Sequence, residues 1–355
     1  MKTIYDVDKN FTVESKLEVT GIQFYNALSQ PFSIHGVFFE DGKYRRLPEK
    51  IAESTNGGVH WLHDNTAGGR VRFRTDSPYV AIHSEMPMVG IMNHFAISGS
   101  ASFDLYVRDS AGREKFVDVF KRDVDNRQGY EAILYPGGSG MQEYTINFPT
   151  YSSVSALHIG LDENAKVEAP APYRYEKPIV FYGSSITQGA CASRAGTAYE
   201  SILSRQFDFD YINLGFSGSA RGEQVMAEYI AGLDMSVFVM DYDHNAPTVE
   251  HLAQTHEPFF QTIRKAYPEI PIILMARPQY HQNENSIARY NVLKATYDNA
   301  VKAGDTNVYL LSGPELMAVA QDDGMVDSAH PNDFGFGSMA KAVGDVLKTI
   351  GYDPL

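Results

Sequence analysis

The chain contains a single cysteine, Cys191, among its 355 residues, so neither an intrachain disulfide nor a cysteine-rich zinc site can form. Positive charge is also scarce, because 30 lysines and arginines stand against 44 aspartates and glutamates, a net charge of −14. An acidic surface repels phosphates and anionic lipids, so we expect neither nucleic acid nor membrane as a partner. The sequence lacks a run of transmembrane length, and Met1 to Asn10 lack the apolar core of a secretory leader. These absences predict a cytoplasmic location, with export open to a chain whose leader has been trimmed.

The pentad Gly-x-Ser-x-Gly is missing as well, which excludes the nucleophile turn of an α/β-hydrolase. The composition that remains is ordinary for a globular protein, with 43% hydrophobic and 21% charged residues. A chain of 355 residues is longer than most single domains. We therefore expect two domains.

Residues 1–167 are predicted to form an antiparallel β-sandwich, similar to a jelly roll, that serves as an accessory domain. Short alternating or aromatic runs recur there, and clusters of turn residues such as Pro136-Gly137-Gly138 separate them. The runs lie at residues 32–38, 71–74, 79–82, 103–107, 116–120, 144–148 and 154–159. A proline-rich linker, residues 168–177, then favours extended backbone between the two domains.

Residues 178–355 change to an alternation of strand and helix. Helical spacing of apolar residues appears in four stretches, which lie near residues 199–206, 249–263, 287–297 and 336–347. Five short apolar runs have the character of buried parallel strands: residues 179–182, 211–214, 237–240, 272–275 and 308–311. This pattern predicts an α/β fold, an α/β/α sandwich around a five-stranded parallel sheet. Ligands of such folds bind beyond the carboxyl ends of the strands.

The first of these strand ends carries the segment Gly183-Ser184-Ser185-Ile186-Thr187-Gln188-Gly189. A hydroxyl on a turn of small residues after a buried strand is well placed to act as a nucleophile. Turns of this composition are also common without any catalytic role. The meaning of the segment therefore depends on a base, an orienting acid and oxyanion donors elsewhere in the chain.

Asp327 and His330 are candidates for the acid and the base, because two residues three apart in a helical turn share one face. The backbone N–H groups of Ser185 and Gly218 and the side-chain amide of Asn245 are candidate oxyanion donors. Each position also has a structural explanation, namely a surface turn, a left-handed turn residue or a helix cap. A catalytic role is favoured because each of these segments follows a separate predicted strand or precedes the last predicted helix, in the order that such a site requires.

These segments resemble the four blocks of the SGNH (GDSL-type) hydrolase superfamily, over about residues 178–350. Ser184 stands where the common motif has Asp, and the third block has His244 before Asn245 and Ala246 after it, which points to a subgroup. In the first half, Ser102-Phe103-Asp104-Leu105-Tyr106 is similar to the Gly-x-Asp-Leu-Tyr signature of a β-sandwich found before such esterase domains. The blocks match at Ser185, Gly218, Asn245, and Asp327 with His330.

The resemblance implies a flavodoxin-like sheet and a serine esterase with the triad Ser185, His330 and Asp327 and the oxyanion hole Ser185, Gly218 and Asn245. It further implies a short acyl group, such as acetyl, on a sugar or small polyol, an acyl-enzyme on Ser185, and no cofactor or metal. The partner is then a small-molecule or carbohydrate ester; the sequence does not indicate the oligomeric state. An acyltransferase using the same site and a non-catalytic glycan-binding protein are the alternatives.

Three further features have competing interpretations. Asp241, Asp243 and His244 have the chemistry of metal ligands, but no spaced partner accompanies them. Cys191 lies near the candidate nucleophile and is expected to pack as a small apolar residue. Trp61, the only tryptophan, is expected in the core or at a domain interface, with stacking on a sugar as the alternative.

Overall fold

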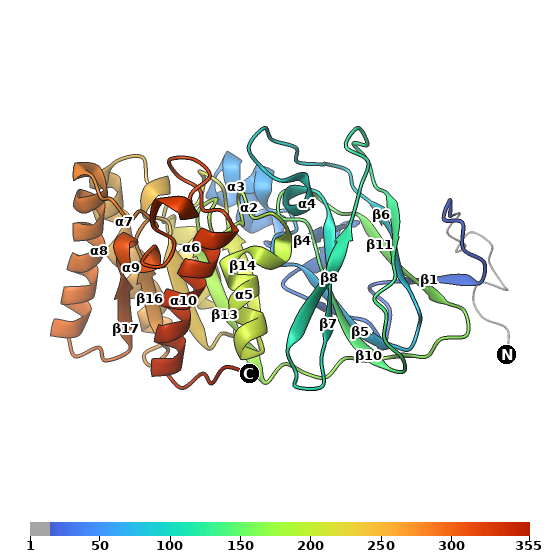
Figure 1. Cartoon of the computed structure of the whole chain (residues 1–355). Coiled ribbons are helices and arrows are strands. Elements are labelled where there is room, and N and C mark those ends of the chain that lie inside the picture. Colours follow the sequence, from blue (N-terminus) through green and yellow to red (C-terminus); the bar gives the residue numbers. More distant parts are fainter. Residues whose placement is uncertain (1–14) are drawn as a thin grey trace.

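The computed structural model describes residues 15–355, which form two parts that lie side by side (Figure 1). The predicted absence of a leader concerns Met1 to Asn10, which lie outside the described residues. Among the helices that are described, none combines the length and the apolar character needed to cross a bilayer.

The N-terminal part is built from two antiparallel sheets that enclose one apolar core, as predicted. Residues that alternate along the strands fill this core, for example Phe103 and Leu105. One sheet has the order β1 (Ile22–Asn26), β11 (Ala156–Asp162), β6 (Val80–Glu85) and β9 (Glu131–Leu134). The other has the order β12 (Val167–Glu168), β5 (Arg70–Thr75), β10 (Gln142–Asn147), β7 (Phe103–Arg108) and β8 (Glu114–Phe120), with β2 (Ser33–His35) also paired to β5. A separate hairpin joins β3 (Phe38–Glu40) to β4 (Lys43–Arg45).

The C-terminal part contains the predicted five-stranded parallel sheet, and each apolar run lies within one of its strands. Its carboxyl edge brings together the ends of strands that are far apart in sequence, as the position of ligand sites in such folds requires. The strand order is β14 (Phe209–Gly215), β13 (Tyr175–Gly183), β15 (Val237–Asp241), β16 (Ile272–Met275) and β17 (Val308–Leu311).

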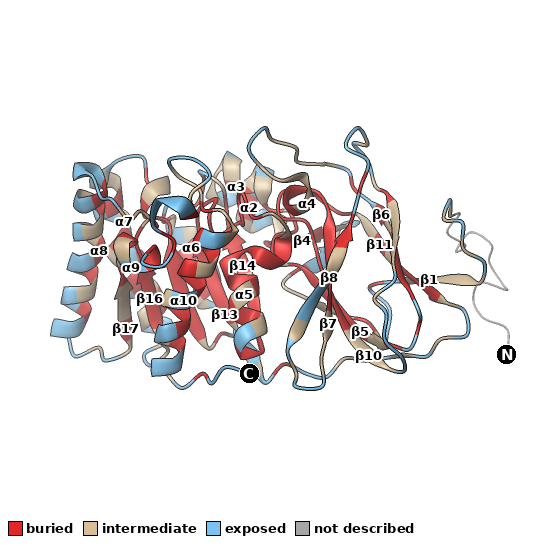
Figure 2. Ribbon diagram, viewed as in Figure 1, coloured by how far each residue is buried: buried red, intermediate tan, exposed pale blue. Residues whose placement is uncertain are grey.

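Helices cover both faces of this sheet, and alternate residues of each strand face opposite layers. Val180 and Tyr182 contribute to one apolar cluster, whereas Ile179 and Phe181 contribute to the other. Figure 2 shows the resulting buried sheet between helices that are exposed on their outer sides. The first face is covered by α6 (Gln224–Ala231), α7 (Val249–Ala266) and α8 (Glu284–Lys302), and the second by α5 (Tyr199–Phe207), α9 (Gly313–Leu316) and α10 (Asp333–Thr349).

Short helices in the N-terminal part were not predicted. They are α2 (Glu49–Thr55), α3 (Gly57–Leu62) and α4 (Ile97–Ser100). Each is too short to show a helical period, and α2 and α3 gain their stability from docking: Ala52 and Val59 join the apolar cluster of the parallel sheet. The expectation that Trp61 is buried is wrong, because its position on α3 leaves it 71% exposed.

The Gly-x-Asp-Leu-Tyr-like segment on β7 holds the two parts together. Phe103 and Leu105 point into the sandwich core, so Asp104 and Tyr106 point the other way. The buried Asp104 carboxylate accepts a hydrogen bond from the Gly196 N–H at 2.7 Å. A Cβ atom on Gly196 would lie 2.5 Å from the Tyr106 ring, so only glycine permits this close approach. The signature therefore docks the sandwich against the loop that follows Ser185.

Candidate active site

The loop after β13 buries two adjacent serines but turns their hydroxyls toward different partners. The Ser184 hydroxyl accepts a hydrogen bond from the Ile186 N–H at 3.1 Å, and its own N–H donates to the Asp241 carbonyl at 2.9 Å. Ser184 is fully buried by these contacts, whereas the Ser185 Oγ lies 3.0 Å from the His330 Nε2. Gly183 is required beneath them, since a Cβ there would lie 2.3 Å from the Asp241 carbonyl oxygen. The geometry thus singles out Ser185.

Asp327 and His330 lie in a turn that the Asp327 carboxylate closes itself. Its Oδ1 accepts the N–H groups of Ala329 and His330, both at 2.7 Å, and the Val326 N–H donates to the His330 carbonyl at 2.8 Å. The turn is an Asx-type turn before α10, not the helical turn that the spacing suggested. Its effect on the two side chains is the one expected, because the His330 Nδ1 lies 2.9 Å from the Asp327 Oδ2.

The ionisation of Asp327 fixes the proton on the imidazole. Partial burial alone would raise its pKa, but hydrogen bonds from the His330 ring and from the N–H groups of Ala329 and His330 outweigh that effect and lower the pKa to about 2. At neutral pH the carboxylate is ionised and only accepts hydrogen bonds, so the His330 Nδ1 carries the proton. The His330 Nε2 then has a free electron pair, which accepts the Ser185 hydroxyl.

The candidate oxyanion donors lie at the ends of neighbouring strands. Within residues 15–355, the backbone N–H groups of Ser185 and Gly218 donate to no protein acceptor. Gly218 adopts a left-handed φ of +64°, and a Cβ there would meet nothing within 4 Å, so the loop is open on this side. The Asn245 amide donates to the Phe216 carbonyl at 3.1 Å, which leaves its second N–H for a ligand.

Gln188 holds these loops together, a role that no local sequence pattern indicates. Its Oε1 accepts the Ser217 N–H at 3.0 Å, next to Gly218. Its Nε2 donates to the Asn65 side chain and to the Thr150 carbonyl, each at 3.2 Å. This fully buried side chain therefore connects the loop after β13, the loop after β14 and the sandwich.

Asp333, the first residue of α10, was also missed. Its carboxylate accepts the Ser193 N–H at 2.8 Å and the Thr197 hydroxyl at 2.7 Å, and it contacts the Ser193 hydroxyl as well. Only the packing of α10 against the loop after Ser185 brings these residues together, so a local pattern could not have revealed it. The contact ties the segment that carries His330 to the segment that carries Ser185.

The sandwich contributes side chains next to the triad. The rings of His94 and Phe95 lie 5.7 and 6.1 Å from the His330 ring, centroid to centroid. Phe95 in turn packs on Tyr151 at 4.8 Å, and the Tyr151 hydroxyl donates to the Ser185 carbonyl at 3.3 Å. The N-terminal part therefore forms one side of the candidate site.

The structure shows the surroundings of two features with competing interpretations, the acidic cluster after β15 and Cys191. Asp241, Asp243 and His244 do gather, with one ligand atom of each within 4.8 Å of the others. Asp241 accepts the Thr187 hydroxyl at 2.8 Å, and Asp243 accepts the Arg277 N–H at 3.1 Å, so both carboxyl groups already serve the loops that carry Ser185 and Asn245.

Cys191 is buried, and burial raises the pKa of its thiol to about 12. A neutral thiol at physiological pH is a poor nucleophile.

A parallel α/β/α sheet with a serine, an imidazole and a carboxylate hydrogen-bonded in series at its carboxyl edge defines a serine hydrolase. Residues 176–348 match the GDSL-like Lipase/Acylhydrolase family, and residues 22–167 match the family described as the N-terminus of Esterase_SGNH_hydro-type, named GxDLY. The chain is therefore an SGNH-type esterase, a carboxylic ester hydrolase that carries the GxDLY N-terminal domain. No curated protein matches the chain.

Solved structures resemble the chain over nearly its whole length. A protein from Bacteroides ovatus ATCC 8483, described as a GDSL-like lipase, is 27% identical with a TM-score of 0.82, over 93% of this chain and 98% of that one. The salicylyl-acyltransferase SsfX3 of a tetracycline biosynthetic pathway is 18% identical with a TM-score of 0.76, over 94% and 99%. An acetyl xylan esterase from the rumen bacterium Butyrivibrio proteoclasticus is 12% identical with a TM-score of 0.58, over 93% and 100%. The last two likenesses concern the fold.

Proposed function

We propose that this esterase removes a short acyl group, such as acetyl, from a sugar or another small polyol through an acyl-enzyme on Ser185. The observation that carries the proposal is the continuous chain of contacts from the Ser185 Oγ through the His330 ring to the Asp327 carboxylate. The fold shared with an acetyl xylan esterase supports the choice of acyl group and alcohol.

The proposed mechanism starts with a proton on the His330 Nδ1 and a free electron pair on its Nε2. The His330 Nε2 takes the Ser185 proton as the Oγ forms a bond to the acyl carbon, and the Asp327 carboxylate stabilises the imidazolium that results. The carbonyl oxygen gains negative charge, which the Ser185 and Gly218 N–H groups and the Asn245 amide stabilise. Collapse of this intermediate breaks the ester bond, and His330 returns the proton to the leaving alcohol. Water then attacks the acyl-enzyme by the same route and releases the acid.

The proposal is tested by steady-state turnover of p-nitrophenyl acetate and of a panel of acetylated sugars by the wild type and by Ser185→Ala. Ser184→Ala is the matched control, because it removes the neighbouring hydroxyl, which only accepts an N–H inside the loop. We expect Ser185→Ala to lose turnover of every substrate and the control to retain most of it. Full activity of Ser185→Ala would refute the role of this serine. A preference for long-chain aryl esters with no turnover of acetylated sugars would refute the substrate class.

Acyl transfer to an alcohol is the second candidate, favoured by the way Phe95 and Tyr151 of the sandwich close one side of the site. Such a wall can exclude water from the acyl-enzyme and leave an alcohol as the better acceptor. The fold shared with a salicylyl-acyltransferase supports it. Incubation with an acyl donor and candidate alcohols decides between the two, since the ratio of free acid to new ester identifies the acceptor.

A further inference from the structure

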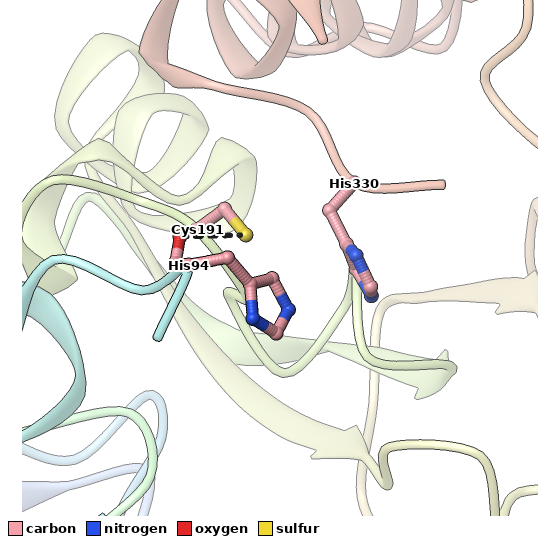
Figure 3. A group of neighbouring side chains, drawn as sticks. All are labelled: His94, Cys191 and His330. Atoms are coloured by element: carbon pink, nitrogen blue, oxygen red, sulfur yellow. Dashed lines mark hydrogen bonds between the residues drawn. The ribbon is translucent and has the colours of Figure 1, made fainter. Parts of the chain in front are cut away.

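Three metal-ligating side chains meet beside the triad, and only one of them has a role in the proposed reaction. They are His94, Cys191 and His330, from three segments far apart in sequence (Figure 3). One ring nitrogen of each histidine and the Cys191 Sγ all lie within 4.8 Å of one another. The Cys191 thiol already approaches the His94 main chain, since its Sγ lies 3.6 Å from the His94 carbonyl oxygen.

Two imidazoles and a thiolate form a donor set suited to zinc, and binding of the ion releases the proton of the Cys191 thiol to solvent. Zn²⁺ is a borderline-soft ion that binds three protein ligands and leaves a fourth position for water or another small ligand. With Zn–N and Zn–S bonds of standard length, ligand atoms lie about 3.3–3.6 Å apart, so closing the observed cluster takes shifts of about 1 Å. The His94 side chain is 40% exposed and lies outside any helix or strand, and this adjustment moves its 2.8 Å contact with the Asn93 side chain and its packing on the Phe95 ring.

Negatively charged groups around the cluster also favour the binding of a cation. The Asp327 Oδ2 lies 3.9 Å from the His94 Nε2, on the edge of the cluster. A carboxylate next to a metal-bound imidazole orients the ring and strengthens its binding. The whole chain adds to the attraction, with a net charge of −14.

We propose that His94, Cys191 and His330 form a Zn²⁺ site and that its occupation reversibly inhibits the esterase. Without metal, the His330 Nδ1 is held by Asp327 and its Nε2 by Ser185. Coordination of Zn²⁺ by either nitrogen displaces one of these partners, so the proton path between Ser185 and Asp327 is interrupted in both cases. The inhibition rests on the proposed function, whereas the binding of metal does not.

Two measurements on the full-length protein, freed of metal by EDTA and dialysed, test the site. The first is the Zn²⁺ concentration that halves p-nitrophenyl acetate turnover, scaled to each variant's own activity, for the wild type, Cys191→Ser and His94→Gln. We expect inhibition of the wild type that EDTA reverses, and at least about tenfold more Zn²⁺ for both variants. His281→Gln, which alters an exposed histidine elsewhere, is the matched control and should behave as the wild type.

The second measurement is independent of activity. Addition of Co²⁺ should produce thiolate-to-cobalt absorption in the near ultraviolet with the wild type and not with Cys191→Ser, and Zn²⁺ should abolish the absorption. Thermal melting of both variants checks that each is folded, and His94→Gln carries the test alone if Cys191→Ser is not. Equal inhibition of all variants, or no cobalt absorption with the wild type, would overturn the proposal. Cobalt absorption in a protein without esterase activity would refute the proposed function and leave the metal site standing.

Discussion

At the scale of single residues, the site depends on two adjacent serines with opposite orientations. Ser184 uses its hydroxyl to accept the Ile186 N–H within the loop, so only Ser185 presents its Oγ to His330. The depressed pKa of Asp327 places the proton on the Nδ1 of that imidazole and leaves the Nε2 as an acceptor. In the proposed reaction, contacts of individual atoms therefore set the direction of proton transfer from Ser185.

Asn245 should matter to the rate more than to binding. If its free N–H stabilises the developing oxyanion, Asn245→Ala should lower kcat by about 10²–10³ while KM changes little, because the charge exists only in the transition state. The measurement is steady-state kinetics with p-nitrophenyl acetate. Asn299→Ala removes an exposed amide that donates to Glu257 on the helical surface and serves as the control. A loss of kcat below about threefold would show that Asn245 is not an oxyanion donor.

At the scale of elements, the site exists because the ends of β13, β14 and β15 meet at one edge of the sheet. Gly215 closes β14 against the loop after β13 so tightly that a Cβ would lie 2.3 Å from the Gln188 backbone nitrogen. The Gln188 side chain then fixes the loop that carries Gly218. The spacing of the oxyanion donors is therefore a property of packed backbone.

Gly215→Ala should separate the two loops, since the atoms that a methyl group would meet are backbone atoms of Thr187 and Gln188. We expect a loss of about 1–3 kcal/mol in the free energy of unfolding together with a fall in kcat. Urea denaturation and steady-state kinetics measure the two effects. Gly57→Ala, where a Cβ would meet nothing within 4 Å, should change neither. Wild-type stability and kcat in Gly215→Ala would contradict this account of the loops.

Glu200, on α5, makes the stability depend on pH in a predictable direction. Burial, with the nearby Asp241 charge adding to it, holds the pKa of this carboxyl well above its usual range. In the unfolded chain, the Glu200 carboxyl loses its proton at about pH 4.3. Unfolding at higher pH therefore releases a proton, so the stabilising contribution is complete below that pH and is lost as pH rises toward the folded pKa.

Glu200→Gln removes this proton release without changing the shape of the side chain. Melting temperatures measured from acid to alkaline pH should fall less steeply for the variant than for the wild type. Glu257→Gln, a carboxylate on the outer side of α7 that accepts the Asn299 amide, is the control and should follow the wild type. Parallel curves for Glu200→Gln and the wild type would contradict a raised pKa at this position.

The parallel sheet and the candidate triad could be predicted from sequence, because buried strands have continuous apolar runs and strand ends converge. The exposed Trp61 and the docked helices α2 and α3 could not, because their environment is decided by the packing of the two parts. The same holds for Gln188 and Asp333, whose partners come from separate segments. Local pattern predicts elements, whereas contacts between distant segments decide what supports the site.

At the scale of the whole molecule, the sandwich is docked on the α/β part beside the candidate site. Arg70 and Arg108 of the sandwich form ion pairs with Asp210 and Asp208 of the α/β part, at 2.5 and 2.6 Å. Asp104 adds a buried hydrogen bond to Gly196 in the loop that follows Ser185. The position of His94 and Phe95 beside His330 depends on this docking.

Asp104→Ala should weaken the docking, because it leaves the Gly196 N–H and the Asn147 amide without their acceptor in a buried place. Each buried unsatisfied donor costs about 1–3 kcal/mol, so the free energy of unfolding should fall by at least that much. Chemical denaturation is the measurement. Asp118→Ala, at an exposed carboxylate of β8, is the control and should stay within about 0.5 kcal/mol of the wild type. Equal stability of the two variants would contradict the role of Asp104.

The central claim, that Ser185 is a nucleophile activated by His330, is tested most directly by covalent labelling. A fluorophosphonate reacts readily only with an activated serine, and peptide mass spectrometry identifies the residue that carries it. The account predicts a single labelled residue, Ser185, and no label in Ser185→Ala or after replacement of His330 by alanine. Absence of labelling in the wild type, or labelling of another serine such as Ser184 or Ser217, would contradict it.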